Sequence, residues 1–120
     1  MIDVDHFKGI NDTRGHAAGD ESLRTIGRAL RASVRRGDLV SRHGGEEFCV
    51  LMHQATAPEA ARFDTRLRNR LAGEPGNQFT YSAGSATLLP DDTLDTLLHR
   101  ADRALYDAKA TGRDRLRHAP

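Results

Sequence analysis

Acidic side chains lie beside two stretches of this sequence that read as buried strands. Asp3 and Asp5 alternate with apolar residues at the start of the chain, and the pair Glu46 and Glu47 directly precedes the apolar run 48–52. Successive strand residues point to opposite faces, so the two aspartates share one face and one of the two glutamates can join them. Such carboxylates repel unless a cation, a donor or water screens them, and Mg²⁺ takes one or two carboxylates together with water and phosphate oxygens. The acids indicate either a magnesium site or, more simply, solvated acids on a hairpin turn and a strand end.

Two further stretches could bind the rest of a nucleotide. Gly44 and Gly45 precede the glutamates, and because they lack side chains they would let a flat base or sugar lie against the backbone. The stretch FKGIND follows the opening strand, where N–H groups at the start of a helix attract anions and Lys8 adds a positive charge. By itself, FKGIND is better explained as an ordinary junction between a strand and a helix.

Lys109 and Arg113 are four residues apart at the end of a predicted helix, so both side chains could reach one phosphate group. The carbonyl end of a helix also attracts cations without any function. The spacing alone favours that structural explanation, and a phosphate-binding role needs support from the rest of the chain.

The composition limits the class of protein. With 120 residues the chain is expected to form one domain with a single core. Its 18 Lys and Arg against 17 Asp and Glu give a net charge of +1, which argues against a nucleic-acid-binding protein. The longest apolar run, 48–52, is far too short to span a membrane. The single cysteine, Cys49, lies in that run, which favours a buried thiol and a reducing, cytoplasmic compartment.

The elements that would position these residues follow from the apolar periodicity. Residues 7–21 are rich in Gly, Asn and Asp, so we predict a short helical turn followed by a loop. Strands that pair antiparallel at the centre, with helices on one face, would give an α+β sandwich of the ferredoxin-like kind. The chain opens with a predicted strand at 2–4, and a helix is predicted from Asp20 or Glu21 to about Arg36, followed by a hairpin of strands 39–41 and 47–52. A helix with a capping box at Thr56–Glu59 and a strand within 78–89 come next. The last predicted elements are a helix capped by Asp92 and ending at Gly112, and a short edge strand after it.

Three blocks of the sequence together resemble a known family. The blocks DVDHFKGINDTRGHAAGDESL, RRGDLVSRHGGEEF and RADRALYDAKATGR are similar, in order and approximate spacing, to those of the GGDEF family, the diguanylate cyclases. The resemblance covers nearly all of the chain, and the first block with GGEEF is highly specific. It implies an antiparallel palm-like sheet flanked by helices, as in nucleotidyl cyclases. It also implies condensation of two GTP into cyclic di-GMP with release of two pyrophosphates.

The resemblance also implies roles for individual residues. Asp3, the carbonyl of Val4 and Glu46 correspond to ligands of Mg²⁺ or Mn²⁺, and Glu46 with its neighbour Glu47 to the catalytic acids. A carboxylate bound to Mg²⁺ is a poor base, so the metal itself is the alternative means of activating the attacking 3′-hydroxyl. Lys8 corresponds to the charge that steadies the transition state. A carboxylate suits the recognition of guanine because it can accept hydrogen bonds from the N1–H and the 2-amino group of the base. Adenine does not offer this pair of donors. The implied GTP-binding residues are Phe7, Asn11, His16, Asp20, Gly44, Gly45, Lys109 and Arg113.

Two further implications concern control. One domain holds one GTP, so two copies must face each other before a 3′-hydroxyl meets the other copy's α-phosphate. A homodimer is therefore expected, and in the family an attached sensory or receiver domain usually governs it. Arg35 and Asp38, shortly before GGEEF, resemble the family's R-x-x-D inhibitory site for cyclic di-GMP, with Arg66 as a second arginine. The residues alone indicate only a helix end followed by a turn.

The sequence departs from the family pattern in two places. Family members usually begin with a helix and a full first strand, so we expect residues 1–120 to form one GGDEF domain that lacks this helix and the start of the strand. The stretch YSAGSA has small residues where the family more often has larger aliphatic ones, which predicts a thinner core. These departures keep a second hypothesis open, a catalytically silent module that binds GTP or cyclic di-GMP.

Overall fold

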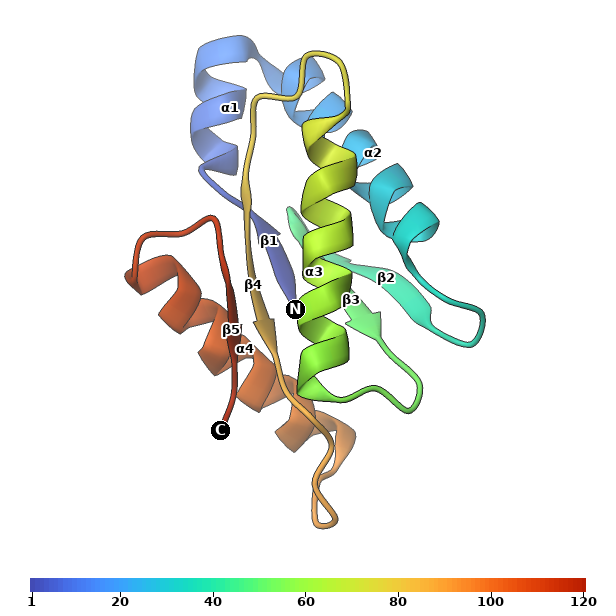
Figure 1. The fold of residues 1–120 in the computed structure, drawn as a ribbon. Helices are drawn as coiled ribbons and strands as arrows, with labels where there is room; N and C mark the ends of the chain where they lie inside the picture. Colours follow the sequence, from blue (N-terminus) through green and yellow to red (C-terminus); the bar gives the residue numbers. More distant parts are fainter.

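The computed structural model describes every residue from Met1 to Pro120. The five strands form one sheet in the order β2-β3-β1-β4-β5, antiparallel throughout except for the parallel pair β4–β5 at one edge (Figure 1). The expected α+β fold with an antiparallel centre is therefore confirmed. None of the helices has the length and apolar character needed to cross a bilayer. In chain order the elements are β1 (Ile2–Val4), α1 (Phe7–Arg14), α2 (His16–Ser33), β2 (Leu39–Gly44), β3 (Glu47–Leu51), α3 (Ala57–Ala72), β4 (Tyr81–Ser85), α4 (Leu94–Ala110) and β5 (Leu116–His118).

Helices cover both faces of the sheet, so the prediction that all of them lie on one face is wrong. α2 and α3 lie over one face and α4 lies over the other (Figure 1). Val4 of β1 and Leu67 of α3 belong to the larger core cluster, whereas Cys49 of β3 belongs with Ala101 and Leu105 of α4 to a smaller one. Because strand residues alternate between faces, the sheet buries apolar side chains on both sides. The thiol of Cys49 is buried, as predicted.

Residues 7–21 form two packed helices, so the prediction of a helical turn and a loop is wrong. α1 and α2 are separated only by Gly15, whose φ of 87° turns the chain. Gly19 of α2 lies so close to Asn11 of α1 that an added Cβ would overlap the amide oxygen. Ile10 also buries its side chain in the larger core. Tertiary packing here outweighs the low helix propensity of Gly, Asn and Asp.

The small residues of β4 match the helix that covers them. The strand runs from 81 to 85, which is shorter than the predicted stretch 78–89. A Cβ on Gly84 would overlap the α4 backbone at Ala101 and Leu105. Only glycine allows the two backbones to approach so closely.

A pocket of about 540 Å³ opens where β1 begins. It is lined by Met1, by the small residues Ala83 and Ser85 of β4, and by Leu98 of α4. The backbone nitrogen of Met1 donates to the carbonyl of Gly84 at 2.7 Å. Ala83 and Ser85, two of the small residues of β4, thus form part of the wall of this pocket.

The helix ends agree with the sequence patterns in part. The capping box of α3 is confirmed, because the N–H of Thr56 donates to the Glu59 carboxylate at 2.7 Å. α2 ends at Ser33, before the predicted position. Thr93, not Asp92, caps α4, and Asp92 instead accepts a hydrogen bond from a backbone N–H in the preceding turn. The predicted edge strand is present as β5.

Candidate active site

Asp3 lies on the central strand of the sheet, on the face that α4 covers. In the β1–β3 ladder it is directly opposite Glu47, and its side chain is 7% exposed. Lys109, in the last turn of α4, places its ammonium group 2.9 Å from the Asp3 carboxylate. The fold therefore joins the start of the chain, the glycine hairpin and the end of the last helix at one point.

The surroundings of Asp3 disfavour its negative charge. Burial raises the pKa of this carboxyl, and the charges of Glu46 and Glu47 raise it further, whereas the hydrogen bond and charge of Lys109 lower it. On balance the pKa lies above its usual value of 3.8. Acids that repel one another, with only one cation to compensate, form the kind of arrangement that a bound cation would relieve.

The two glutamates of the GGEEF hairpin have different positions. Glu47 begins β3, and because it is paired opposite Asp3 its side chain lies on the same face of the sheet. Glu46 lies in the turn, where its carbonyl accepts from the N–H of Val4 at 3.2 Å. The structure gives Glu47 the direct cross-strand position, although Glu46 is close enough to raise the pKa of Asp3. The ligand role inferred for Glu46 stays a prediction, and Glu47 is an equal candidate.

The turn between β2 and β3 leaves open space beside its glycines. No heavy atom lies within 4 Å of the Cβ positions that Gly44 and Gly45 lack. Gly45 has a φ of 47°, a conformation that favours glycine. Arg42 donates from Nε to the Gly45 carbonyl at 2.9 Å and so closes the turn. The open space agrees with the predicted approach of a flat ligand, and Arg42 is a residue that sequence reasoning missed despite its place beside the motif.

The predicted guanine-binding residues gather where α1 packs on α2. Asn11 lies against Gly19, which directly precedes Asp20, and the ring of Phe7 is 3.3 Å from the Cβ position that Gly19 lacks. Asp20 is exposed, as is His16 at the start of α2. The structure thus brings Phe7 and Asn11 beside the segment that carries Asp20, with His16 one turn earlier.

Lys8 does not contact the acidic cluster. Its side chain is 91% exposed and pairs with Asp12 of the same helix at 3.0 Å. Its inferred role in steadying the transition state would require the side chain to leave this position, and that role stays a prediction.

Lys109 and Arg113 are separated by the end of α4. Lys109 pairs with Asp3, whereas Arg113 lies exposed in the following loop. Gly112, Arg113 and Asp114 all have positive φ, at 118°, 61° and 46°. The joint reach of the lysine and the arginine to one phosphate group stays a prediction.

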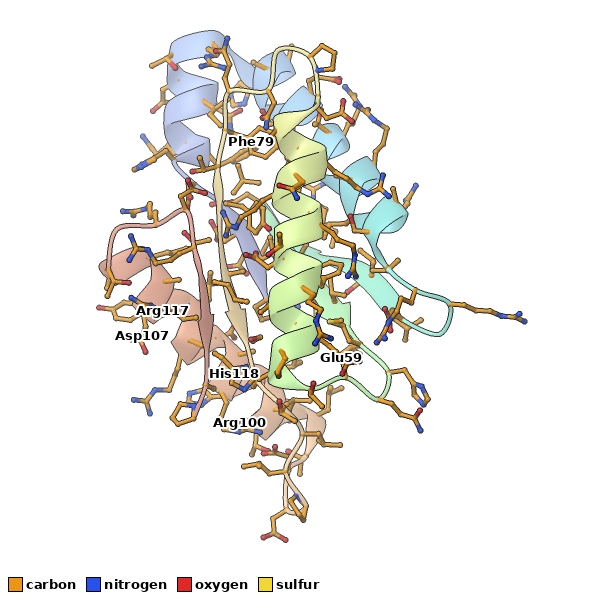
Figure 2. The ribbon with its side chains drawn as sticks, viewed as in Figure 1. Glu59, Phe79, Arg100, Asp107, Arg117 and His118 are labelled. Atoms are coloured by element: carbon orange, nitrogen blue, oxygen red, sulfur yellow. The ribbon has the colours of Figure 1, made fainter.

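Arg35 and Asp38 belong to a closely bonded loop. The Asp38 carboxylate accepts from the N–H groups of Arg35 at 2.9 Å and His53 at 3.0 Å, and its side chain is 1% exposed. Arg35 also lies 3.5 Å from Glu59, which Figure 2 shows at the start of α3. Burial raises the pKa of Asp38, but the two backbone donors and the charge of Arg35 outweigh it, so the pKa lies below 3.8.

Arg66 of α3 reaches the same corner of the molecule. Its Nη2 donates to the carbonyl of Ser33 at 3.3 Å, and Ser33 lies two residues before Arg35. The fold therefore brings Arg66 to the end of α2, where Arg35 and Asp38 follow. Binding of cyclic di-GMP by these three residues stays a prediction.

The oxygen donors around Asp3 suit a hard divalent cation. Asp3 and Glu47 offer carboxylates from neighbouring strands, and Glu46 lies nearby. No group of three or more His, Cys, Asp or Glu side chains is placed so that it could hold a metal ion. Mg²⁺ is bound in proteins through one or two carboxylates and takes its remaining ligands from water and substrate phosphates, so Asp3 with Glu46 or Glu47 would suffice to hold it.

Curated proteins have sequences similar to this chain. The family description "Diguanylate cyclase, GGDEF domain" matches residues 1–115. The chain is 45% identical to the response regulator PleD of Caulobacter vibrioides, over 95% of this chain and 27% of PleD. It is 38% identical to the diguanylate cyclase DgcZ of Escherichia coli, over 96% of this chain and 41% of that protein. The chain thus spans well under half the length of these relatives.

Solved structures share the fold over nearly the whole chain. The GGDEF domain of DgcB from Caulobacter crescentus, in complex with c-di-GMP, aligns with a TM-score of 0.90 and 31% identity, over 98% of this chain and 74% of that chain. The active GGEEF domain of a diguanylate cyclase from Vibrio cholerae aligns with a TM-score of 0.89 and 31% identity, over 99% of this chain and 80% of that chain. Sequence and fold agree, and the chain belongs to the GGDEF family of diguanylate cyclase domains.

Proposed function

We propose that this domain is a diguanylate cyclase, which condenses two GTP molecules into cyclic di-GMP and releases two pyrophosphates. The observation that carries the proposal is the convergence of Asp3, Glu47 and Lys109 at one point of the sheet. Carboxylates suit the cation that accompanies a nucleoside triphosphate, and an ammonium group suits its phosphates. Family membership and the diguanylate cyclases among the relatives support the same reaction.

The residues around Asp3 would bind the metal and the phosphates. Asp3, the carbonyl of Val4 and either Glu46 or Glu47 would hold Mg²⁺ or Mn²⁺. When bound, such an ion neutralises phosphate charge and lowers the pKa of a coordinated hydroxyl. Lys109 already lies within the acidic cluster, so it needs only a side-chain movement to contact a triphosphate there. The positive charge of Lys109 would stabilise the negative charge that develops on the phosphate oxygens as the new bond forms.

The corner between α1 and α2 would bind the guanine base. Asn11 and Asp20 offer an amide and a carboxylate, and the carboxylate can accept from N1–H and the 2-amino group. Phe7 and His16 lie beside them on the same two helices. Arg113 and Lys8, both exposed, would move to contact the phosphates.

The reaction requires two copies of the domain. One site holds one GTP, and the attacking 3′-hydroxyl must come from the nucleotide of a second copy. We therefore propose a homodimer as the active form and as the point of control. A sensory or receiver domain upstream in a longer protein would suit this control, and PleD, of which the chain covers 27%, is named a response regulator.

The test is to incubate the purified chain with GTP and Mg²⁺ and to follow cyclic di-GMP by chromatography. We expect product in the wild type and none in Asp3→Ala or in the double variant Glu46→Ala, Glu47→Ala. Asp91→Ala changes an exposed acid outside the site and serves as the control. Turnover that survives Asp3→Ala would contradict the proposal.

The second candidate function is a silent module that binds GTP or cyclic di-GMP without converting GTP. The exposed position of Lys8, paired with Asp12 and away from the acids, favours it. Calorimetry separates the two functions, because a silent module would bind GTP with Mg²⁺ and yet form no product in the assay above.

Product feedback is the third part of the proposal. Arg35, Asp38 and Arg66 meet at the end of α2, and we propose that this corner binds cyclic di-GMP. Arginine suits the task because its guanidinium group stacks on a base and donates in a plane. The DgcB domain solved with c-di-GMP supports a product site somewhere in this fold.

A further inference from the structure

Asp5, which follows β1, is a buried carboxylate that the proposed reaction does not use. It is 4% exposed, and its Oδ1 accepts from the hydroxyl of Ser82 at 2.6 Å. Its Oδ2 accepts from the hydroxyl of Thr80 at 2.7 Å and from the backbone N–H of Asp114 at 3.1 Å. Three donors satisfy the charge, so this carboxylate has no need of a cation. The last bond ties the start of the chain to the loop after α4.

Arg68 of α3 holds the side chain of Asp114 from the other side. Its Nη1 lies 2.5 Å from Asp114 Oδ1, and its Nε lies 2.8 Å from Asp64 Oδ2. The guanidinium group also lies over the ring of Tyr81, 4.2 Å from the centroid. The hydroxyl of Tyr81 in turn donates to Asp64 at 2.7 Å. Arg68 is therefore fixed by groups from α3 and β4 before it reaches the loop.

The loop that receives these contacts has an unfavourable backbone conformation. Gly112, Arg113 and Asp114 are three consecutive residues with positive φ, and two of them carry a Cβ. Positive φ is uncommon for such residues because the Cβ crowds the backbone, so the conformation needs outside support. The N–H of Asp114 bound to Asp5, and its carboxylate bound to Arg68, supply that support.

We propose that Asp5 and Arg68 are positioning residues for Arg113. By holding Asp114 from two sides, they fix the left-handed turn that presents the Arg113 guanidinium group to the triphosphate of GTP. Neither residue is proposed to touch the nucleotide, so their effect must pass through the loop. The inference rests on the proposed function for the identity of the ligand, whereas the loop and its contacts are observed.

The test measures nucleotide affinity by calorimetry with Mg²⁺ and 3′-deoxy-GTP, which lacks the attacking hydroxyl and so reports binding without turnover. Asp114→Asn removes the ion pair with Arg68 but keeps the N–H that Asp5 accepts, and Asn tolerates positive φ well. We expect this variant to bind about fivefold more weakly than wild type. Arg68→Lys, which cannot bridge Asp64 and Asp114 with one planar group, should lose a similar factor.

A double-mutant cycle separates positioning from general damage. In an Arg113→Ala background, Asp114→Asn should cause no further loss of affinity, because its effect passes through the absent arginine. Additive losses would overturn the proposal, as would wild-type affinity in Asp114→Asn. Arg70→Lys, an exposed arginine on the same helix, is the control and should bind as wild type does. Thermal unfolding confirms that the compared variants are folded.

Hydrogen exchange gives a readout that does not depend on nucleotide binding. Asp5→Asn should raise the exchange rate of the Asp114 amide by about tenfold or more, because this amide loses its charged acceptor. An unchanged rate would overturn the role of Asp5.

If the wild type binds 3′-deoxy-GTP but makes no cyclic di-GMP, the cyclase proposal fails and the double-mutant cycle still decides the positioning role. If it binds no nucleotide, both proposals fail.

Discussion

Asp3 and Asp38 are both nearly buried carboxylates, 7% and 1% exposed, yet their surroundings move their pKa values in opposite directions. Asp38 accepts hydrogen bonds from two backbone N–H groups, which hold its pKa below the usual value despite burial. Asp3 has burial and two glutamates against it and a single lysine in its favour. A carboxylate whose oxygens accept from backbone N–H groups holds a loop together. A carboxylate that neighbouring charges repel is available to bind a ligand.

The comparison also shows how a motif and a structural role can occupy the same residues. Asp38 belongs to the R-x-x-D pattern, but its oxygens already serve the loops before β2 and after β3. Arg35 is engaged by Glu59 and by the carbonyl of His53. A product molecule at this corner would have to draw Arg35 away from those partners, while Asp38 stays in place.

The largest expected effect that tests this comparison is that of Asp3→Asn. Cyclic di-GMP formation should fall more than about 100-fold, because changes in residues that merely support metal ligands already cost roughly 10–100-fold. The melting temperature of Asp3→Asn should equal or exceed that of the wild type, because the variant removes a buried negative charge that Glu46 and Glu47 repel. Chromatography of the product and circular dichroism of thermal unfolding measure the two quantities. Asp91→Asn is the control, and a variant that unfolds readily but retains turnover would reverse the interpretation of Asp3.

Asp38→Ala should show the opposite behaviour. The N–H groups of Arg35 and His53 would lose a charged acceptor, so the free energy of unfolding should fall by about 2 kcal/mol. Urea denaturation followed by circular dichroism measures this loss, with the exposed Asp91→Ala as the control. A free energy of unfolding equal to that of the wild type would show that Asp38 has no structural role.

The contribution of Asp38 should depend on pH. Its pKa is lower in the folded than in the unfolded chain, so the stability it contributes is present above the usual 3.8 and is lost as pH falls through the folded pKa. The difference in unfolding free energy between wild type and Asp38→Asn should therefore stay constant from neutral pH to about pH 5 and shrink below 3.8. Urea titrations at a series of pH values measure it. A difference that does not change with pH would contradict the assigned cause.

The smallest expected effects concern Arg35 at the proposed product site. Arg35→Ala should raise the concentration of cyclic di-GMP that half-inhibits the reaction. Glu59→Gln should lower it by about threefold, because it releases Arg35 from an exposed ion pair while glutamine preserves the capping box. Initial rates at increasing product concentration give both values. An unchanged inhibition curve for Arg35→Ala would reject the site.

Local patterns predicted much of the fold. The capping box at Thr56 and the apolar spacing after it gave the start and the buried face of α3, and the hairpin around GGEEF is present. The prediction for residues 7–21 was wrong because their composition disfavours a helix, whereas the contact between Asn11 and Gly19 stabilises two helices there. That contact depends on the packing of one helix on another, which no propensity describes.

What the sequence determined by itself is the set of chemical groups and their local geometry: an acid pair alternating on a strand, glycines at a turn, and cations at a helix end. Only the tertiary structure decided which of these groups meet. The register that puts Asp3 opposite Glu47, the approach of Lys109 to Asp3, and the bond from Asp114 to Asp5 all join distant parts of the chain. The physical reason is that side-chain spacing assigns a residue to a face of its own element, whereas strand register and helix packing assign it to a neighbour.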